Sequence, residues 1–175
     1  MDLDFDICEI REYYDSELRE YDYNELVRLG ISHGDADFMV SIGVPEDYDD
    51  FVFYGRDIFK KTLIEGVEFI NIGHYSCYGI LDPNALYLKK GSDGLFINSS
   101  HHKPAIYMLN KNLRTFFLFE LIRNELAMKM KQESEYNEKK YARELRKLYE
   151  QIDPVAMKDL DGYWSHLIED YETGL

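Results

Sequence analysis

Residues 105–117 have the sequence AIYMLNKNLRTFF, in which a strand pattern changes to a helix pattern within a few residues. Apolar side chains run from Ala105 to Leu109, which predicts a short strand. Asn112 suits the N-cap of a helix that extends from Leu113 to about Gln132. The apolar residues of that segment fall on more than one helical face, so we expect this helix to be the most buried one of the fold.

The chain before this junction contains further short strands separated by turn signals. Lys89–Gly94 supplies two glycines and an aspartate, residues that tight turns need for positive φ, and it predicts a hairpin turn. Strands joined by short turns form an antiparallel sheet, because parallel neighbours need a long crossover. The predicted strands are Val67–Gly73, Tyr78–Leu81, Ala85–Leu88 and Leu95–Asn98.

Helical periodicity dominates both ends of the chain. From Ile7 to Leu29 apolar residues recur mostly at steps of three and four, which predicts one or two amphipathic helices that end at Gly30. The segment Tyr141–Ile152 has the same periodicity, with a basic outer side. Asp153 and Pro154 form a good N-cap and N1 pair, so we expect a final helix to begin there.

Two short segments between these parts complete the predicted fold. Val44–Asp47 places a proline before two carboxylates, a pattern that suits a first helical turn. A strand at Phe51–Tyr54 is an equally good assignment for the residues that follow. The elements together predict one α+β domain over residues 1–175, with a central antiparallel β-sheet flanked by N-terminal and C-terminal helices. Residues 133–175 form its C-terminal helical extension.

Charge is distributed unevenly along the 175 residues, which carry 34 acids and 20 bases. Residues 1–57 hold seventeen acids and four bases (net −13), whereas residues 58–175 hold seventeen acids and sixteen bases (net −1). This excess disfavours nucleic acid and anionic membranes as partners and favours a cationic partner. The acidic segment is either a solvated surface that keeps the protein in solution or a docking surface for a basic partner.

Composition also bears on where the protein works. The N-terminus lacks the basic start and apolar run of a secretory signal, and no stretch reaches the ~18 apolar residues that span a bilayer. Cys8 and Cys77 are the only cysteines, which argues against a disulfide framework. We therefore expect a cytoplasmic protein without a membrane segment.

Reactive groups do not converge in a pattern typical of an enzyme. The sequence contains no activated-serine turn, phosphate loop or dinucleotide fingerprint. His74 and Cys77 are close in sequence, but two ligands do not make a metal site. Carboxylate pairs such as Asp35 with Asp37 are numerous, so a hydrolase that uses such a pair is kept only as an alternative. We predict no catalytic residues, no metal site and no cofactor.

The junction at residues 105–117 resembles the strand–Asn–x–x–Leu–x–x–Phe transition of the SUKH superfamily, which includes bacterial toxin-immunity proteins and related yeast cell-wall regulators. Gly43-Val44-Pro45 is similar to the Gly-Leu-Pro-like motif of that family. The strands around Asp93-Gly94 resemble its central hairpin. Ile152-Asp153-Pro154 and Tyr163-Trp164 resemble the Asp-Pro and Trp of the C-terminal helices in its fourth group.

The resemblance covers roughly Leu26 to Ile168 and implies an α+β domain without catalytic residues. It also implies an intracellular immunity protein that binds and neutralises a cognate toxin domain, often a nuclease or another nucleic-acid-modifying enzyme. A nuclease presents a cationic groove to phosphates, so an acidic surface suits the same electrostatic field. The alternative is a regulatory scaffold of the same fold that binds cellular partners.

The candidate partner-binding residues are acids of the first part of the chain, together with two tyrosines as aromatic anchors. Charges at the rim of an interface set association rate and specificity, whereas buried anchors supply much of the affinity. The sequence leaves the identity of the toxin and the oligomeric state open. The candidates are Asp35, Asp37, Glu46, Asp47, Tyr48, Asp49, Asp50, Tyr54 and Asp57.

Overall fold

The computed structural model describes residues 5–14, 18–48, 50–75, 84–98 and 106–174. The strands in this part of the chain are β1 (Leu18–Arg19), β2 (Val44–Pro45), β3 (Asp47–Tyr48), β4 (Phe51–Phe53), β5 (Lys60–Ile64), β6 (Val67–Tyr75), β7 (Asn84–Lys89), β8 (Leu95–Asn98) and β9 (Ile106–Asn110). The helices are α1 (Ile7–Tyr13), α2 (Tyr23–Leu29), α3 (His33–Ile42), the short 3₁₀ helix η1 (Arg56–Ile58), α4 (Leu113–Gln132), α5 (Glu138–Ile152) and α6 (Tyr163–Thr173).

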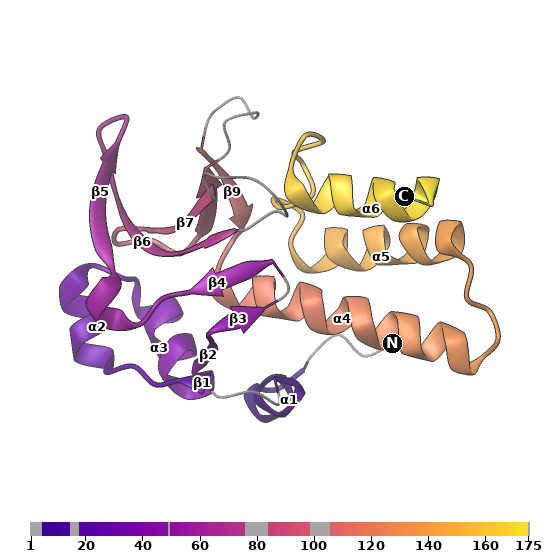
Figure 1. Cartoon of the computed structure of the whole chain (residues 1–175), viewed down its shortest axis with the longest axis horizontal. Coiled ribbons are helices and arrows are strands. Elements are labelled where there is room, and N and C mark those ends of the chain that lie inside the picture. The colour runs from indigo at the N-terminus through magenta and orange to yellow at the C-terminus, as the bar shows by residue number, and fades with distance from the viewer. Residues whose placement is uncertain (1–4, 15–17, 49, 76–83, 99–105, 175) are drawn as a thin grey trace.

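A seven-stranded antiparallel sheet packs with helices from both ends of the chain, which confirms the predicted α+β class (Figure 1). The strand order is β3-β4-β6-β7-β8-β9, and β5 pairs with β6. A separate two-stranded ribbon joins β1 to β2. The strands predicted around β6, β7, β8 and β9 and the hairpin turn between β7 and β8 are therefore confirmed.

Strand β6 organises the sheet because three other strands pair with it. β7 follows one edge, while β5 pairs with residues 67–71 and β4 with residues 73–75 along the other edge. Gly73 lies where β4 approaches most closely, and a Cβ atom at this position would be 2.2 Å from the carbonyl oxygen of Val52. The pairing of β4 with β6 therefore depends on the missing side chain of Gly73.

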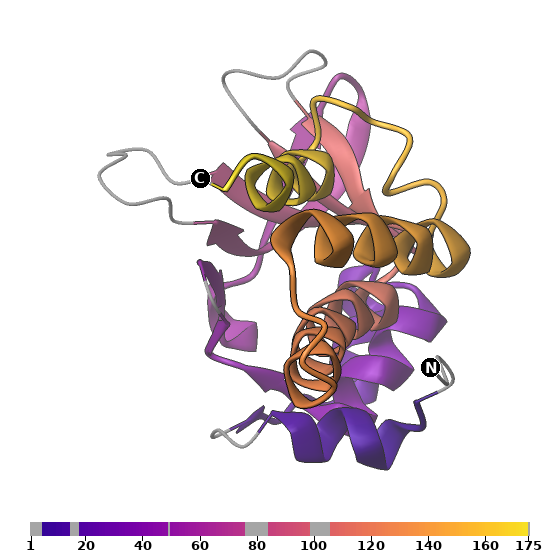
Figure 2. The ribbon, with the colours of Figure 1, turned by 90° about the vertical axis from the view of Figure 1, so that its right-hand side faces the viewer.

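Helix α4 runs through the interior, where it contacts α1, α3, α5 and β9 (Figure 2). Its predicted N-cap is confirmed, because the Asn112 Oδ1 atom accepts a hydrogen bond from the Thr115 N–H group at 2.9 Å. Every residue from Thr115 to Ile122 is buried, so the helix presents no outer face in its first half. The expectation of apolar positions on more than one face is thus also confirmed.

Two buried carboxylates close the N-terminal end of α4. Asp35 of α3 accepts a hydrogen bond from the Leu113 N–H group at 2.9 Å. Asp153, which follows α5, accepts hydrogen bonds from the Lys111 N–H group at 2.7 Å and from the Thr115 hydroxyl at 3.0 Å. N–H groups in a first helical turn lack intrahelical partners, and the helix dipole favours negative charge near them. The two carboxylates thereby join α3 and α5 to the strand–helix junction.

The helical turn predicted at Val44–Asp47 is wrong. Gly43 ends α3 with a φ of 74°, and β2 follows at once, paired with Leu18 and Arg19. This pairing with a distant segment overrides the local signal of a proline before two acids, which shows that the signal is not specific for a helix. The strand alternative for the residues after it is confirmed, because Phe51–Phe53 is β4.

The final helix begins later than predicted. The Asp153 Oδ1 atom does accept a hydrogen bond from the Ala156 N–H group at 3.3 Å, as an N-cap would, but turns follow and α6 starts only at Tyr163. Sequence analysis also missed β5, because its short segment Lys60–Ile64 buries no side chain fully. The strand predicted at Tyr78–Leu81 lies outside the described residues.

Helices α5 and α6, predicted as a C-terminal extension, share the main hydrophobic core with the sheet and α4. Tyr149 of α5 stacks on Phe119 with 3.8 Å between ring centroids, and Trp164 of α6 meets the same ring edge-on. Among the helices of the described segments, none combines the length and the apolar character that a membrane crossing requires.

Replacing Asp35 with Asn should change the dependence of stability on pH. Burial is the main cause that raises the pKa of Asp35 to about 6 in the folded protein. Between about pH 4 and pH 6 the folded state therefore holds a proton that the unfolded state has lost. The unfolding free energy of the wild type should fall across this interval relative to that of Asp35→Asn, by up to about 3 kcal/mol.

Urea unfolding at a series of pH values measures this difference. Asp37→Asn, an exposed carboxylate on the same helix, is the matched control and should leave the pH profile of the wild type unchanged. Parallel profiles for the wild type and Asp35→Asn would contradict the prediction.

Candidate functional site

The structure divides the predicted partner-binding acids into buried and exposed ones. Asp35 is only 1% exposed and faces the N-terminal end of α4, so its predicted place on a docking surface is wrong. Asp37 lies two positions later on α3 and is exposed, because residues two apart point to different sides of a helix. Asp49 lies outside the described residues, and Asp47 is described only as a backbone position in β3.

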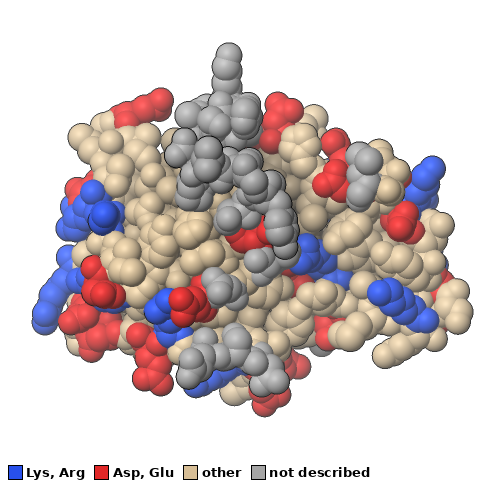
Figure 3. Space-filling view, in the orientation of Figure 1, with Lys and Arg blue, Asp and Glu red and all other residues tan. Residues whose placement is uncertain are grey.

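Glu46 and Asp57 also reach the surface. Glu46 follows β2 and forms an ion pair with Arg19 of β1 at 2.9 Å, while its side chain remains 65% exposed. Asp57 lies in η1, and Asp50 is half-buried in the turn before β4. Acidic side chains gather at the lower left of Figure 3, the region where Figure 1 places α2, with a few basic side chains among them.

The two predicted aromatic anchors are engaged within the fold. The Tyr48 hydroxyl donates a hydrogen bond to the Glu120 Oε2 atom at 3.3 Å, and its ring lies edge-on to that of Tyr14 at 5.0 Å between centroids. The Tyr54 hydroxyl forms a hydrogen bond with the His74 Nδ1 atom at 2.8 Å. Both tyrosines are half-buried, so each already has a structural role.

A hollow that sequence reasoning missed lies between the end of α1, β1 and the end of α3. It has a volume of about 240 Å³. Its lining mixes polar and apolar groups, and Val40 within it is 44% exposed. We call it the α1–α3 hollow. It is lined by Arg11, Leu18, Glu20, Tyr21, Val40, Ile42 and Gly43.

One of the predicted acids lies near the α1–α3 hollow. Asp37 precedes Val40 by three residues on α3, so the two side chains lie on the same face of that helix. Glu46 is paired with Arg19, and neither residue lines the hollow. The hollow was not predictable because its walls come from three separate segments, and the exposure of Val40 in an apolar run is known only from the packing of α3.

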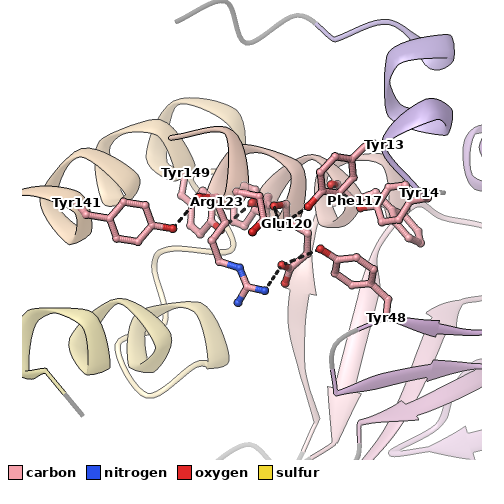
Figure 4. A network of polar contacts seen from close by, with 10 residues as sticks. Tyr13, Tyr14, Tyr48, Phe117, Glu120, Arg123, Tyr141 and Tyr149 are labelled. Atoms are coloured by element: carbon pink, nitrogen blue, oxygen red, sulfur yellow. Dashed lines mark hydrogen bonds and ion pairs between the residues drawn. The ribbon is translucent and has the colours of Figure 1, made fainter. Parts of the chain in front are cut away.

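A second polar site surrounds α4 in the interior (Figure 4). The Glu120 side chain is fully buried, and its Oε2 atom lies 2.8 Å from the guanidinium of Arg123, whose side chain is 15% exposed. Three tyrosine hydroxyls donate hydrogen bonds to main-chain carbonyls of the same helix at 2.8–2.9 Å. These tyrosines are Tyr14, Tyr141 and Tyr149.

Burial, and after it the Glu120 carboxylate, raises the pKa of Tyr48 and Tyr149 well above the ordinary value of a tyrosine. Burial likewise raises the pKa of Tyr14 and Tyr141. The four hydroxyls therefore keep their protons and act as hydrogen-bond donors. Their geometry suits a structural network that ties α1, β3 and α5 to α4.

The carboxylates considered for a hydrolase do not face each other. Asp35 points into the fold and Asp37 points to solvent, so they cannot share one substrate. Within the described segments, no three His, Cys, Asp or Glu side chains are grouped so that they could hold a metal ion. Cys77, the possible partner of His74, lies outside these segments.

Comparison of the chain with protein families, curated proteins and solved structures found no significant match. Functional inference therefore depends on the chemistry of the α1–α3 hollow. It combines apolar side chains with the charged side chains of Arg11 and Glu20, a mixed lining that suits the binding of an amphipathic side chain presented by a basic surface.

Removing the cation of the buried ion pair should destabilise the fold more than neutralising both partners. Arg123→Met takes the guanidinium away from the buried Glu120 carboxylate, which we expect to cost about 3 to 5 kcal/mol of unfolding free energy. Adding Glu120→Gln should restore much of this loss, because an amide carries no charge to desolvate. Chemical denaturation of the wild type, both single variants and the double variant measures the coupling. Equal losses in Arg123→Met and in the double variant would contradict it.

Proposed function

We propose that this protein is a non-enzymatic immunity protein that binds and neutralises a basic toxin domain through the α1–α3 hollow and the acids beside it. The observation that carries the proposal is the placement of charge. Residues 1–57 have a net charge of −13 against −1 for the rest of the chain. Glu20 of this acidic part lines the α1–α3 hollow, and Asp37 is exposed three residues before Val40 on α3.

The hollow and the acids have different tasks in this proposal. Exposed carboxylates attract a cationic surface over a distance and raise the association rate, but each contributes little to the affinity. A desolvated apolar contact slows dissociation, and the floor around Val40 can receive one aromatic or long aliphatic side chain of the partner. Arg11 and Glu20 at the wall add a base and an acid that orient the partner.

The chemistry of the partner follows from the same charges. A nuclease or another enzyme that acts on nucleic acid carries a cationic groove for phosphates, so an acidic protein that docks there excludes the substrate. The resemblance to SUKH immunity proteins implies the same class of partner. The proposed toxin is therefore a nuclease or another nucleic-acid-targeting domain.

Charge reversal of three exposed acids in the first part of the chain should slow association with the toxin domain. The variant combines Glu20→Lys, Asp37→Lys and Glu46→Lys, and the probe is the toxin-domain polypeptide encoded by the adjacent reading frame. We expect the association rate at low salt to fall about tenfold or more, because steering is lost, and its dependence on salt to weaken. Stopped-flow mixing at several salt concentrations measures both effects.

A matched control carries the same change in net charge at exposed acids of the C-terminal helices and the loop between them. It combines Glu133→Lys, Glu150→Lys and Asp170→Lys. This control should associate at a rate close to that of the wild type. Equal slowing in both variants, or unchanged kinetics in the first, would overturn the docking surface proposed here.

Placing a charge on the floor of the hollow should weaken the complex through faster dissociation. Val40→Asp adds a negative charge, so electrostatic steering is retained while the apolar contact is lost. We expect the Kd to rise at least about tenfold, mainly because the dissociation rate increases. Val155→Asp is the control, because Val155 is 41% exposed and lies in the turns after α5. A Kd unchanged by Val40→Asp would show that the hollow is not the anchor site.

Cell survival separates immunity from the regulatory-scaffold alternative. Cells that produce the toxin domain should survive when they also produce this protein, and the triple charge-reversal variant should protect them less. A protein that binds several unrelated cellular partners and gives no protection would instead be a scaffold of the same fold.

A further inference from the structure

The hairpin of β5 and β6 projects from the body of the molecule (Figure 1). Its two turn residues, Glu65 and Gly66, have positive φ angles of 51° and 80°, which is typical of a tight type I′ turn. Ile64 pairs with Val67 directly beside this turn. The turn therefore sets the register of the whole hairpin.

The register also determines which backbone groups of β5 point outward. Residues that flank a two-residue turn form a hydrogen-bonded pair, so Ile64, and with it Thr62 and Lys60, bonds to β6. The N–H and C=O groups of Lys61 and Leu63 then point to the opposite edge. This outer edge of β5 offers two residues with donors and acceptors for another strand.

No strand covers this edge within the described part of the chain, where β5 pairs with β6 alone. The neighbouring strand β4 lies on the same side of β6 and is covered by β3. At the far end of the sheet, the Leu109 carbonyl of β9 accepts a hydrogen bond from the Trp164 indole at 3.2 Å. Within the described segments, β5 thus has an open edge.

Exposed apolar side chains lie on both faces of the same hairpin, with Leu63 on one face and Val67 on the other. Leu63 on β5 is 72% exposed, Ile58 just before β5 is 49% exposed, and Val67 at the start of β6 is 37% exposed. An open strand edge with exposed apolar side chains is a template for association with another strand.

We propose that two copies of this chain pair through their β5 strands, antiparallel, across a two-fold axis at Thr62. In this register Lys61 lies opposite Leu63 of the second copy, and Lys60 lies opposite Ile64 of the second copy. The outward N–H and C=O groups of Lys61 then form hydrogen bonds with those of Leu63 in the second copy, and the reverse. The sheet therefore continues from one copy into the other.

Charge disfavours one alternative register of this pairing. An axis at Lys61 would set two lysines directly opposite each other, whereas the axis at Thr62 pairs each lysine with an aliphatic side chain. Leu63 of each copy becomes a diagonal neighbour of Leu63 of the other, so the most exposed leucines cover each other. All five residues of β5 take part in the pairing.

The location of the hairpin also reduces repulsion between two copies that each carry a net charge of −14. The excess of acid lies in residues 1–57, whereas the hairpin carries two lysines and two glutamates, Lys60, Lys61, Glu65 and Glu68. Contact at β5 therefore brings together two hairpins in which positive and negative charges are equal in number. Added salt screens the remaining repulsion, so the dimer should tighten as salt concentration rises.

Sedimentation equilibrium of the purified protein tests the dimer. The wild type should be dimeric at about 100 μM, where even a weak interface is populated. Leu63→Lys places a lysine opposite Lys61 of the second copy and should give a monomer. Leu160→Lys is the matched control, because Leu160 is 71% exposed on the turns before α6, and this variant should remain a dimer. Circular dichroism verifies that each variant is folded.

Cysteine crosslinking tests the register. In a background with Cys8→Ser and Cys77→Ser, Thr62→Cys places two thiols across the axis, and oxidation should give a disulfide-linked dimer. Lys60→Cys is the control on the same strand. In the proposed register the two cysteines at position 60 lie far apart, because each is opposite Ile64 of the other copy. This variant should not crosslink.

A monomeric wild type, a dimer retained in Leu63→Lys, or equal crosslinking at both cysteine positions would overturn the proposal. It does not depend on the proposed function, because neither a toxin domain nor the α1–α3 hollow enters the test.

Discussion

This fold depends on one constraint. The polar backbone groups at the start of the buried helix α4 need hydrogen-bond partners. Every residue from Thr115 to Ile122 of α4 is buried, and the N–H groups of its first turn have no partners within the helix. Carboxylates of Asp35 and Asp153 approach the N-terminal end, and tyrosine hydroxyls from α1 and α5 reach main-chain carbonyls further along. Each of these contacts also places another element against α4.

The same packing determines which surface is left for a partner. Because α3 turns Asp35 toward α4, Asp37 and Val40 remain on its outer side. The Tyr14 hydroxyl holds the end of α1 against the Phe117 carbonyl, which brings α1 beside α3. The α1–α3 hollow and the acids near it are thus consequences of how three N-terminal segments fit around one helix.

Elements with strong local signals were predictable. Asn112 at the start of α4, Gly30 at the end of α2, and the glycine-rich turn between β7 and β8 act through neighbouring residues, and each is where the sequence indicates. The predictions that were wrong concern segments in which contacts with distant residues override the local sequence signal. Val44 and Pro45 pair with β1 instead of starting a helix. The side chain of Asp153 accepts a hydrogen bond at the junction of β9 with α4, while α6 begins at Tyr163.

The sequence by itself determined the α+β class, the main strands, the central helix and the concentration of acid in residues 1–57, because periodicity, capping and charge are local properties. Only the tertiary structure decided that Asp35 is buried while Asp37 is exposed, that a hollow lies beside Val40, and that β5 has an open edge. Burial and open edges depend on which distant segments pack together, and no window of neighbouring residues contains that information.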